Sequence, residues 1–217
     1  NTPAHLDANF GVHMAEAVLV AINYRLNPRE IAFILNHSES RVLIVDWEFL
    51  PLIQPVMSEL GDIRQFIVVN EPEGKIEWEP PAALDYDTFV AAADDTYPNR
   101  FPADETDTIS INYTSGTTGN PKGVVYTHRS AYLNAICGVL QSTLVPDSIY
   151  LWTLPMFHCN GWCYTWGVTA MGATHVCLRR IEPTGVVKTI QDKCVSHFNG
   201  APIVLRMVAD GAKEMKL

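Results

Sequence analysis

Short apolar runs alternate with longer amphipathic stretches along most of the chain. The runs at 41–45 (Arg-Val-Leu-Ile-Val) and 65–69 (Gln-Phe-Ile-Val-Val) are rich in β-branched residues, which is typical of buried parallel strands. Further strands are expected at 108–112, 124–127, 149–154, 174–178 and 197–199. Apolar residues at helical spacing predict helices at 10–22, 28–36, 48–60, 130–144, 161–171, 183–193 and 203–213.

This order of elements predicts an α/β fold. Strands that alternate with helices form mostly parallel sheets covered by helices on both faces, with right-handed crossovers. Prolines and acidic residues mark 70–106 as an irregular surface excursion with one helical segment, 86–94. Ligands of open α/β sheets bind outside the carboxyl ends of strands. The segments 113–123, 155–158 and 200–202 all follow predicted strands, so we expect them to converge on one edge.

The first of these segments has the composition of a cradle for polyanions. Residues 113–123 read Tyr-Thr-Ser-Gly-Thr-Thr-Gly-Asn-Pro-Lys-Gly. Glycines allow close approach of the backbone to a ligand, and successive N–H groups can form an anion-binding concavity. Hydroxyls add donors, and Lys122 adds a charge suited to phosphate oxygens. Such a cluster can equally be a loop without a ligand, and Gly123 after Lys122 excludes the Walker A pattern.

Composition and charge exclude several classes of function. At 217 residues the chain is one large domain or part of a bigger one. The net charge of −9 argues against nucleic-acid binding, which needs clustered Lys and Arg. No apolar run reaches the roughly 18 residues of a membrane span, and no signal peptide is visible.

The five cysteines are an odd number without the spacing of a disulfide framework. We therefore expect reduced thiols and a cytoplasmic protein. His158, Cys159 and Cys163 offer three candidate metal ligands without a convincing fourth, so no metal site is expected from this chain's own residues.

The signature loop and two later strings together resemble a known family. As a literal string, 114–123 resembles the signature loop of the acyl-adenylate-forming (AMP-binding) enzymes, which include acyl-CoA synthetases, peptide-synthetase adenylation domains and firefly-type luciferases. Residues 154–162 (Leu-Pro-Met-Phe-His-Cys-Asn-Gly-Trp) are similar to the Leu-Pro-Leu-Phe-His-x-x-Gly segment of acyl-CoA synthetases. Residues 197–202 (His-Phe-Asn-Gly-Ala-Pro) resemble another wall of the acyl pocket, and 8–50 read like the early part of such synthetases.

The resemblance implies a role for each string. It makes the loop the binding site for the phosphates of ATP, through Thr114, Ser115, Gly116, Thr117, Thr118, Gly119 and Lys122. It puts His158 beside the reacting carboxylate, as a catalytic and substrate-binding residue. It lines the acyl pocket with Trp162, Gly200, Ala201 and Pro202. In isolation, an aromatic residue such as Trp162 would be more typical of a core than of a pocket.

For the protein as a whole, the resemblance implies a ligase of fatty or other small organic acids. The acid and Mg·ATP would give acyl-AMP and pyrophosphate, and coenzyme A would then displace AMP. Peptide-synthetase adenylation domains tend to carry aspartate where His158 stands, to hold an α-ammonium group, so histidine favours a plain carboxylic acid. An amino-acid adenylation domain and a nucleotide-binding fragment without catalysis stay open as alternatives, and so does a homodimer.

The resemblance also implies that 1–217 is part of a large N-terminal domain. The family completes its site with later segments: a Tyr-Gly-x-Thr-Glu-like motif for AMP and magnesium, a ribose-binding aspartate, a hinge arginine and a C-terminal domain with a catalytic lysine. None of these occurs in 1–217, and about 70 further residues are expected before Asn1. We therefore expect the main Mg²⁺ ligand outside this chain and no ligase activity from the piece alone.

Overall fold

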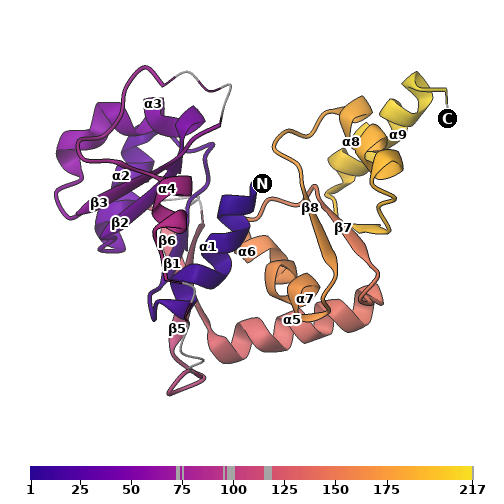
Figure 1. Cartoon of the computed structure of the whole chain (residues 1–217), viewed down its shortest axis with the longest axis horizontal. Coiled ribbons are helices and arrows are strands. Elements are labelled where there is room, and N and C mark those ends of the chain that lie inside the picture. The colour runs from indigo at the N-terminus through magenta and orange to yellow at the C-terminus, as the bar shows by residue number, and fades with distance from the viewer. Residues whose placement is uncertain (72–73, 75, 95, 97–100, 115–118, 217) are drawn as a thin grey trace. The chain divides into compact units, whose positions relative to one another are not determined.

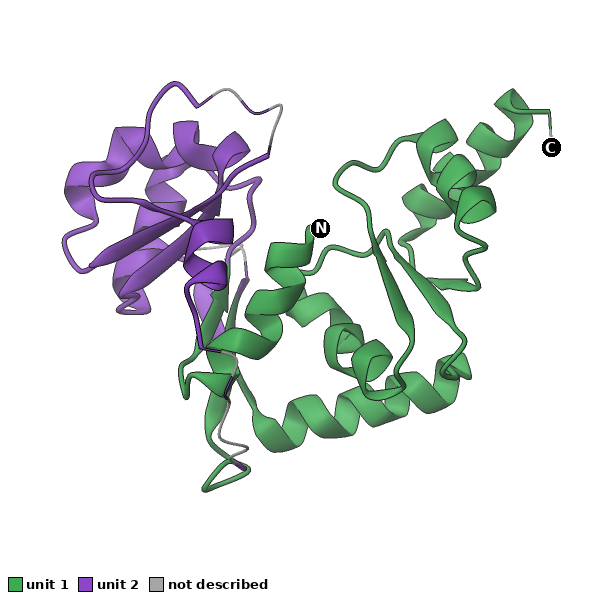
Figure 2. Cartoon of the chain, in the orientation of Figure 1, with its two compact units in different colours: residues 1–21, 102–112, 125–217 green, residues 22–101, 113–124 purple. Residues whose placement is uncertain are grey.

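The computed structural model describes residues 1–71, 74, 76–94, 96, 101–114 and 119–216 (Figure 1). It confirms the predicted α/β class, with parallel strands flanked by helices. The chain divides into two compact units (Figure 2). Unit 1 contains 1–21, 102–112 and 125–217, and unit 2 contains 22–101 and 113–124.

Unit 1 is built from helices around a short parallel sheet. Its helices are α1 (Pro3–Met14), α5 (His128–Ser142), α6 (Cys159–Trp162), α7 (Tyr164–Ala170), α8 (Pro183–Asp192) and α9 (Pro202–Glu214). Its strands are β1 (Leu19–Ala21), β7 (Ile149–Trp152), β8 (Thr174–Cys177) and β9 (His197–Phe198). The helices α8 and α9 pack side by side near the C-terminus (Figure 1).

Unit 2 has a smaller set of elements. Its helices are α2 (Pro28–His37), α3 (Leu50–Ile53) and α4 (Tyr86–Ala91), with 3₁₀ turns η1 (Trp47–Phe49) and η2 (Gln54–Glu59). Its strands are β2 (Val42–Asp46), β3 (Gln65–Val69) and β4 (Leu84–Asp85). Two strands, β5 (Thr108–Thr114) and β6 (Lys122–Thr127), have residues in both units.

The strands of the described residues form three sheets of three strands, in the orders β1-β5-β6, β2-β3-β4 and β8-β7-β9. The pairs β1–β5, β2–β3, β3–β4, β7–β8 and β7–β9 are all parallel. In the second sheet, Leu43 stands opposite Phe66 and Val45 opposite Val68, and all four side chains are buried in the core of unit 2. This burial explains why the two strands read as continuous apolar runs.

The first turn of α2 shows why this helix was predictable from sequence. The side-chain oxygen of Asn27 accepts a hydrogen bond from the backbone N–H of Glu30 at 3.0 Å. The Glu30 carboxylate accepts one from the backbone N–H of Asn27, also at 3.0 Å. This capping box precedes a helix with Pro28 at its first position. Ile31 and Leu35 then pack into the core cluster of unit 2.

The prediction of a helix at 10–22 was wrong in its second half. The helix α1 starts earlier, ends at Met14, and is followed by Glu16 with φ of 57°. Leu19–Ala21 form β1, which pairs in parallel with 110–112 of β5. Pairing with a distant strand thus decides the structure of a run too short to show a period of its own.

Two other predictions needed smaller corrections. The helix predicted at 48–60 is divided into η1, α3 and η2, where Pro51 and Pro55 each remove an amide donor. The excursion at 70–106 contains the short strand β4 just before its predicted helix α4. Among the described helices, none has the length and apolar character needed to cross a membrane.

Candidate functional site

Two of the sequence strings leave neighbouring strands at the same edge of one sheet. The string with His158 follows β7, and 200–202 follow β9, which pairs with β7 in parallel. The Thr153 hydroxyl joins the two, because it donates to the Asn199 carbonyl at 2.7 Å. The signature loop follows β5, which belongs to another sheet. The expectation of one shared sheet edge is therefore correct for two of the three strings.

The segment after His158, which includes α6, is a left-handed turn. This corrects the prediction of a helix from 161 to 171. The regular helix α7 begins at Tyr164. Five consecutive residues before it have positive φ: Cys159 (50°), Asn160 (42°), Gly161 (57°), Trp162 (55°) and Cys163 (63°). An L-residue in this conformation costs about 1–2 kcal/mol. A turn with four such residues needs interactions that offset this cost.

Gly161 is required in the turn by space as well as by φ. A Cβ atom at this position would lie 2.6 Å from Cζ3 of Trp152. Trp152 is fully buried at the end of β7. The turn is therefore packed directly against the sheet, through the one residue of the turn that has no side chain.

A buried hydrogen-bond network holds Asn160 in place. Its side-chain oxygen accepts from the Ser110 hydroxyl at 2.7 Å and from the Asn112 amide at 2.7 Å. Its side-chain amide donates to Asn9 Oδ1 at 2.9 Å, and its backbone N–H donates to Asn112 Oδ1 at 3.3 Å. All four residues are buried. The turn is thereby tied to α1 and to β5 by bonds made away from water, where an unpaired group is costly.

The same network extends to the start of α7. Thr165 donates its hydroxyl to the Asn160 carbonyl at 3.3 Å, and the Trp166 indole N–H donates to the Asn9 carbonyl at 2.9 Å. Ser110 has a single hydroxyl proton for two acceptors, Asn160 Oδ1 and the Leu19 carbonyl at 3.0 Å, and serves one at a time. Sequence reasoning missed this network, because its members are spread from residue 9 to residue 166.

The two predicted functional side chains of this string are exposed. His158 precedes the turn and is exposed, and Trp162 has 57% of its surface exposed although it is a large aromatic residue. This exposure argues against a core role for Trp162. On the other side of the turn, Asn160 and Cys163 face inward and are buried, and burial raises the pKa of the Cys163 thiol. Within the described chain, no three His, Cys, Asp or Glu side chains are arranged to hold a metal ion.

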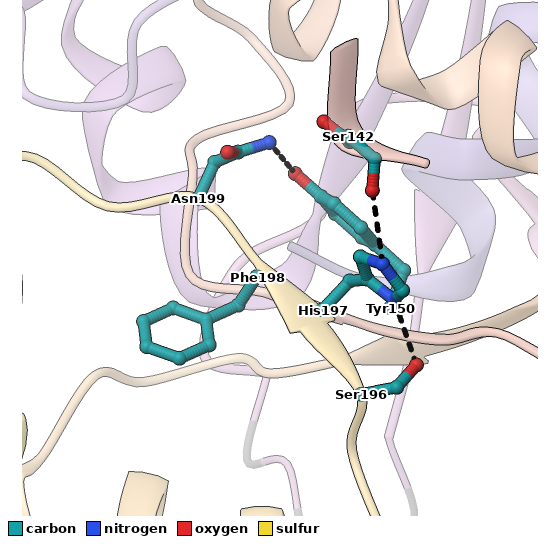
Figure 3. A pocket seen from close by; sticks show the side chains of 6 residues that line it. All are labelled: Ser142, Tyr150, Ser196, His197, Phe198 and Asn199. Carbon is teal, nitrogen blue, oxygen red and sulfur yellow. Dashed lines mark hydrogen bonds between the residues drawn. The ribbon is translucent and has the colours of Figure 1, made fainter. Parts of the chain in front are cut away.

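A pocket of about 300 Å³ lies along β7 and β9 (Figure 3). It is lined by Ser142, Tyr150, Ser196, His197, Phe198 and Asn199. Asn199 donates its amide to the Tyr150 hydroxyl at 3.0 Å. His197 Nε2 lies 3.1 Å from the Ser142 carbonyl and therefore carries a proton, so in the neutral ring Nδ1 accepts from the Ser196 hydroxyl at 2.8 Å. Burial raises the pKa of Tyr150, which keeps this phenol protonated.

The predicted acyl-wall residues lie just beyond this pocket. Gly200 is half-buried, whereas Ala201 and Pro202 are exposed at the start of α9. The pocket reaches Asn199 but is not lined by these three residues. The resemblance implies no role for the side chains of 197–199. The sequence around Tyr150 predicts a strand but gives no indication that this residue lines a pocket.

The described part of the signature loop is exposed at Thr114, Gly119 and Lys122. Thr114 is exposed at the end of β5, and Gly119 has φ of 155°, with open space where a Cβ atom would stand. Lys122 is exposed and opens β6, which starts two residues before the strand predicted at 124–127. Four of the predicted phosphate-binding residues lie outside the described residues: Ser115, Gly116, Thr117 and Thr118.

A contact in unit 2 fixes the residue before the loop. The Tyr113 hydroxyl lies 2.7 Å from Nδ1 of His37, and the two rings meet edge to face with centroids 5.8 Å apart. Partial burial raises the pKa of Tyr113, so the phenol stays protonated at neutral pH. The C-terminal end of α2 therefore anchors the last residues of β5.

Residues 1–217 match the family model of the AMP-binding enzymes over their whole length. The chain belongs to the AMP-binding enzyme family. It is 40% identical over 225 residues to a peroxisomal acetate/butyrate–CoA ligase of Arabidopsis thaliana, and 38% identical over 235 residues to an acetate–CoA ligase of Humulus lupulus. Each match covers 99% of this chain and 40% of the relative, so the chain spans less than half the length of these proteins.

Solved structures agree in fold. A fatty acyl CoA synthetase of Mycobacterium tuberculosis superposes with a TM-score of 0.84 at 24% identity, over 100% of this chain and 40% of that chain. At this level of identity the likeness speaks for the fold alone. It agrees with the prediction of an acyl-CoA synthetase-like fold.

Proposed function

We propose that the protein containing this chain is an AMP-forming acyl-CoA synthetase that activates a plain carboxylic acid. The observation that carries the proposal is the setting of His158. It is an exposed histidine at the carboxyl end of β7, held by a constrained turn, in a chain of the AMP-binding family. Named relatives at 38–40% identity are CoA ligases of acetate and butyrate. A simple organic acid is therefore the substrate class that these observations favour.

The first half-reaction forms the acyl-adenylate. A carboxylate oxygen attacks the α-phosphorus of ATP, the bond from that phosphorus to the bridging oxygen breaks, and pyrophosphate leaves with the electron pair. The problem is electrostatic, because two anions must meet. Lys122 and the loop amides near Gly119 would hold the β- and γ-phosphates and offset their charge. Bound Mg²⁺ would add charge neutralisation, with its main ligands outside this chain.

His158 would position the acid. An imidazole N–H beside the carboxylate can donate a hydrogen bond, which orients the attacking oxygen and lowers its repulsion from the α-phosphate. In the second half-reaction the thiol sulfur of coenzyme A attacks the acyl carbonyl carbon, and AMP leaves with the electrons of the C–O bond. The thiol proton is released to a base or to bulk water.

We propose a short acid, of the size of acetate to butyrate, as the preferred substrate. The two relatives named above support this size by their own substrates. Trp162, on the exposed side of the turn, is the bulky side chain in the string that would limit the acyl channel. Longer fatty acids and aromatic acids are the competing outcomes of a substrate screen.

The test is a pyrophosphate-release screen of the full-length protein. Acids from acetate to octanoate, an aromatic acid and the amino acids are compared, each with ATP and with or without coenzyme A. The expected result is release with short acids and formation of their CoA thioesters. Release with amino acids alone would replace the proposal by an amino-acid adenylation domain.

A variant separates His158 from the rest of the site. His158→Ala in the full-length protein is expected to lower kcat/KM for the acid by about 100-fold, the usual effect of removing one positioned donor. The isolated piece 1–217 is expected to show no ligase activity. ATP–pyrophosphate exchange by that piece would contradict this expectation.

We also propose a cytoplasmic location for the protein. All five cysteines are free in the structure, which fits a reducing compartment. A fluorescent fusion of the full-length protein tests this, with peroxisomal fluorescence as the contrary result.

A further inference from the structure

The buried network around Asn160 ties the turn that follows His158 to strand β5. Asn160 lies two residues after His158 and two before Trp162. Its partner Asn112 lies on β5, two residues before Thr114, where the signature loop begins. One buried side-chain contact of 2.7 Å thus connects the strand that leads into the loop with the turn that presents the acid-binding histidine. The proposed chemistry uses neither asparagine.

The residue type at 160 is demanded by two separate conditions. Its φ of 42° is one that Asn tolerates better than most residues with a side chain. Its side-chain oxygen must also accept hydrogen bonds from Ser110 and Asn112, and its side-chain nitrogen must donate one to Asn9. A glycine satisfies the first condition but not the second. This difference allows the network to be removed while the backbone conformation stays permitted.

The bonds between Asn112 and Asn160 run in both directions. The Asn112 amide donates to the Asn160 side-chain oxygen, and the Asn112 side-chain oxygen accepts from the Asn160 backbone N–H at 3.3 Å. A pair that exchanges donor and acceptor in this way fixes both position and orientation. Both residues are buried, at 7% and 0% exposure, so water does not compete for these bonds.

We propose that Asn160 is a positioning residue that keeps the turn with His158 in register with residues 110–112 of strand β5, and so fixes where His158 holds the acid. This inference rests on the proposed function. Loss of the Asn112–Asn160 pair should shift His158 and so misplace the carboxylate that it holds. Misplacement by about 1 Å can lower the rate of a positioned reaction by about 100-fold. The effect should fall on kcat for adenylation more than on the KM values.

The kinetic test uses the full-length protein and ATP–pyrophosphate exchange. Asn160→Gly and Asn112→Ala are each expected to lower kcat by about 10- to 100-fold. The double variant should be about as slow as the slower single variant, because both single variants remove the side-chain bond between Asn112 and Asn160. The inference would be overturned if the fold-losses in kcat of the two single variants multiplied in the double variant. It would also be overturned if kcat of the single variants stayed within about 2-fold of the wild type.

Ser148→Ala is the matched control for lost stability. Ser148 is buried at 2% exposure and its hydroxyl accepts a hydrogen bond from the Val145 amide, but it lies before β7, away from the network. The Tm of the Ser148→Ala variant is expected to fall while its kcat stays at the wild-type value. An equal loss of kcat in this control would mean that any destabilisation slows the reaction, and would count against a positioning role.

A second measurement tests the link between Asn112 and Asn160 without an activity assay. Hydrogen–deuterium exchange of a peptide covering 158–163 is compared in wild type and Asn112→Ala. The Asn160 amide loses its acceptor in the variant, so faster exchange is expected there, and the Ser148→Ala control should leave this peptide unchanged. Unchanged exchange in Asn112→Ala would overturn the coupling even in an active enzyme.

These readouts keep the two proposals apart. Absence of pyrophosphate release by the wild type with every acid would end the proposed function, whereas the exchange data would still judge the coupling. If Asn160→Gly yields no folded protein, Ser110→Ala is the milder variant, because it removes one of the two bonds to Asn160 Oδ1. It is expected to lower kcat by several-fold, and an unchanged kcat would count against the inference.

Discussion

Thr153 and Asn199 form a single hydrogen bond of 2.7 Å between the ends of two adjacent parallel strands. The donor is the buried residue that directly follows β7, and the acceptor is the carbonyl just before Gly200. This one contact ties the string that contains His158 to the predicted acyl wall.

Thr153→Val should therefore destabilise the protein by about 1–2 kcal/mol, because it preserves shape and leaves the Asn199 carbonyl without this donor. Denaturant unfolding of the full-length protein measures the change. Thr174→Val is the control, since Thr174 is exposed on β8 and its hydroxyl has no partner in the described structure. Its free energy of unfolding should change by less than about 0.5 kcal/mol. Equal effects in both variants would refute a special role for the Thr153 bond.

Gly161→Ala should be more damaging than Gly172→Ala. Both glycines have positive φ, 57° and 66°, so both variants incur about 1 kcal/mol or more of backbone strain. Only at 161 would the new Cβ atom meet Trp152, at 2.6 Å, while open space surrounds position 172. The difference between the two, about 1–3 kcal/mol, isolates the steric clash. Thermal unfolding of the two variants side by side checks it, and equal Tm values would contradict the packing described.

Trp162→Ala should widen the range of accepted acids. If Trp162 limits the acyl channel, its removal should raise kcat/KM for octanoate relative to butyrate by about 10-fold or more. Tyr132→Ala is the control, because Tyr132 is an exposed aromatic residue, at 66%, on α5 and outside the strings. If the ratio of kcat/KM for octanoate to that for butyrate is unchanged in Trp162→Ala, Trp162 does not limit the acyl channel. The rest of the proposed function would not be affected.

Two histidines of α1 should make the protein less stable in mild acid. Burial lowers the pKa of His5 and of His13 to about 4, from 6.5. The folded state therefore binds fewer protons than the unfolded state between these values. Their contribution is complete above about pH 6.5 and is lost as the pH falls toward 4.

His13→Leu tests this dependence. The His13 ring contacts Trp166, and both of its nitrogens are buried without a hydrogen-bond partner, so an apolar side chain can occupy the site. The Tm of the variant relative to wild type should rise as the pH is lowered from 7.5 to 5. A constant difference between the two proteins over that range would show that His13 does not titrate as described.

Sequence patterns were sufficient where burial alone selects the residues. The strand at 65–69 was predicted to the residue, because the central residues of this parallel strand are buried and must be apolar. The helix predicted at 28–36 agrees with α2, whose start is fixed locally by Asn27 and Pro28. The signature loop, His158 and Trp162 were found as strings, and their functional roles remain predictions.

The parts that failed depend on distant partners. Nothing in the local sequence of 159–163 predicts five positive φ angles, since the residues that hold Asn160 lie at positions 9, 110 and 112. The contact of His37 with Tyr113 joins residues 76 positions apart. The pocket beside β9 likewise combines 142, 150 and 196–199. Spatial neighbours of this kind need either a structure or many related sequences.

The left-handed turn also has a consequence for the order of folding. Its stabilising bonds span 48 residues to Asn112 and 151 residues to Asn9, so the loop-closure entropy must be overcome before they form. Until then, positive φ at 159–163 is unfavourable and the segment has no reason to adopt it. We therefore expect this turn to reach its final conformation late, and the proposed acid site beside it to form only when the first and middle parts of the chain have met.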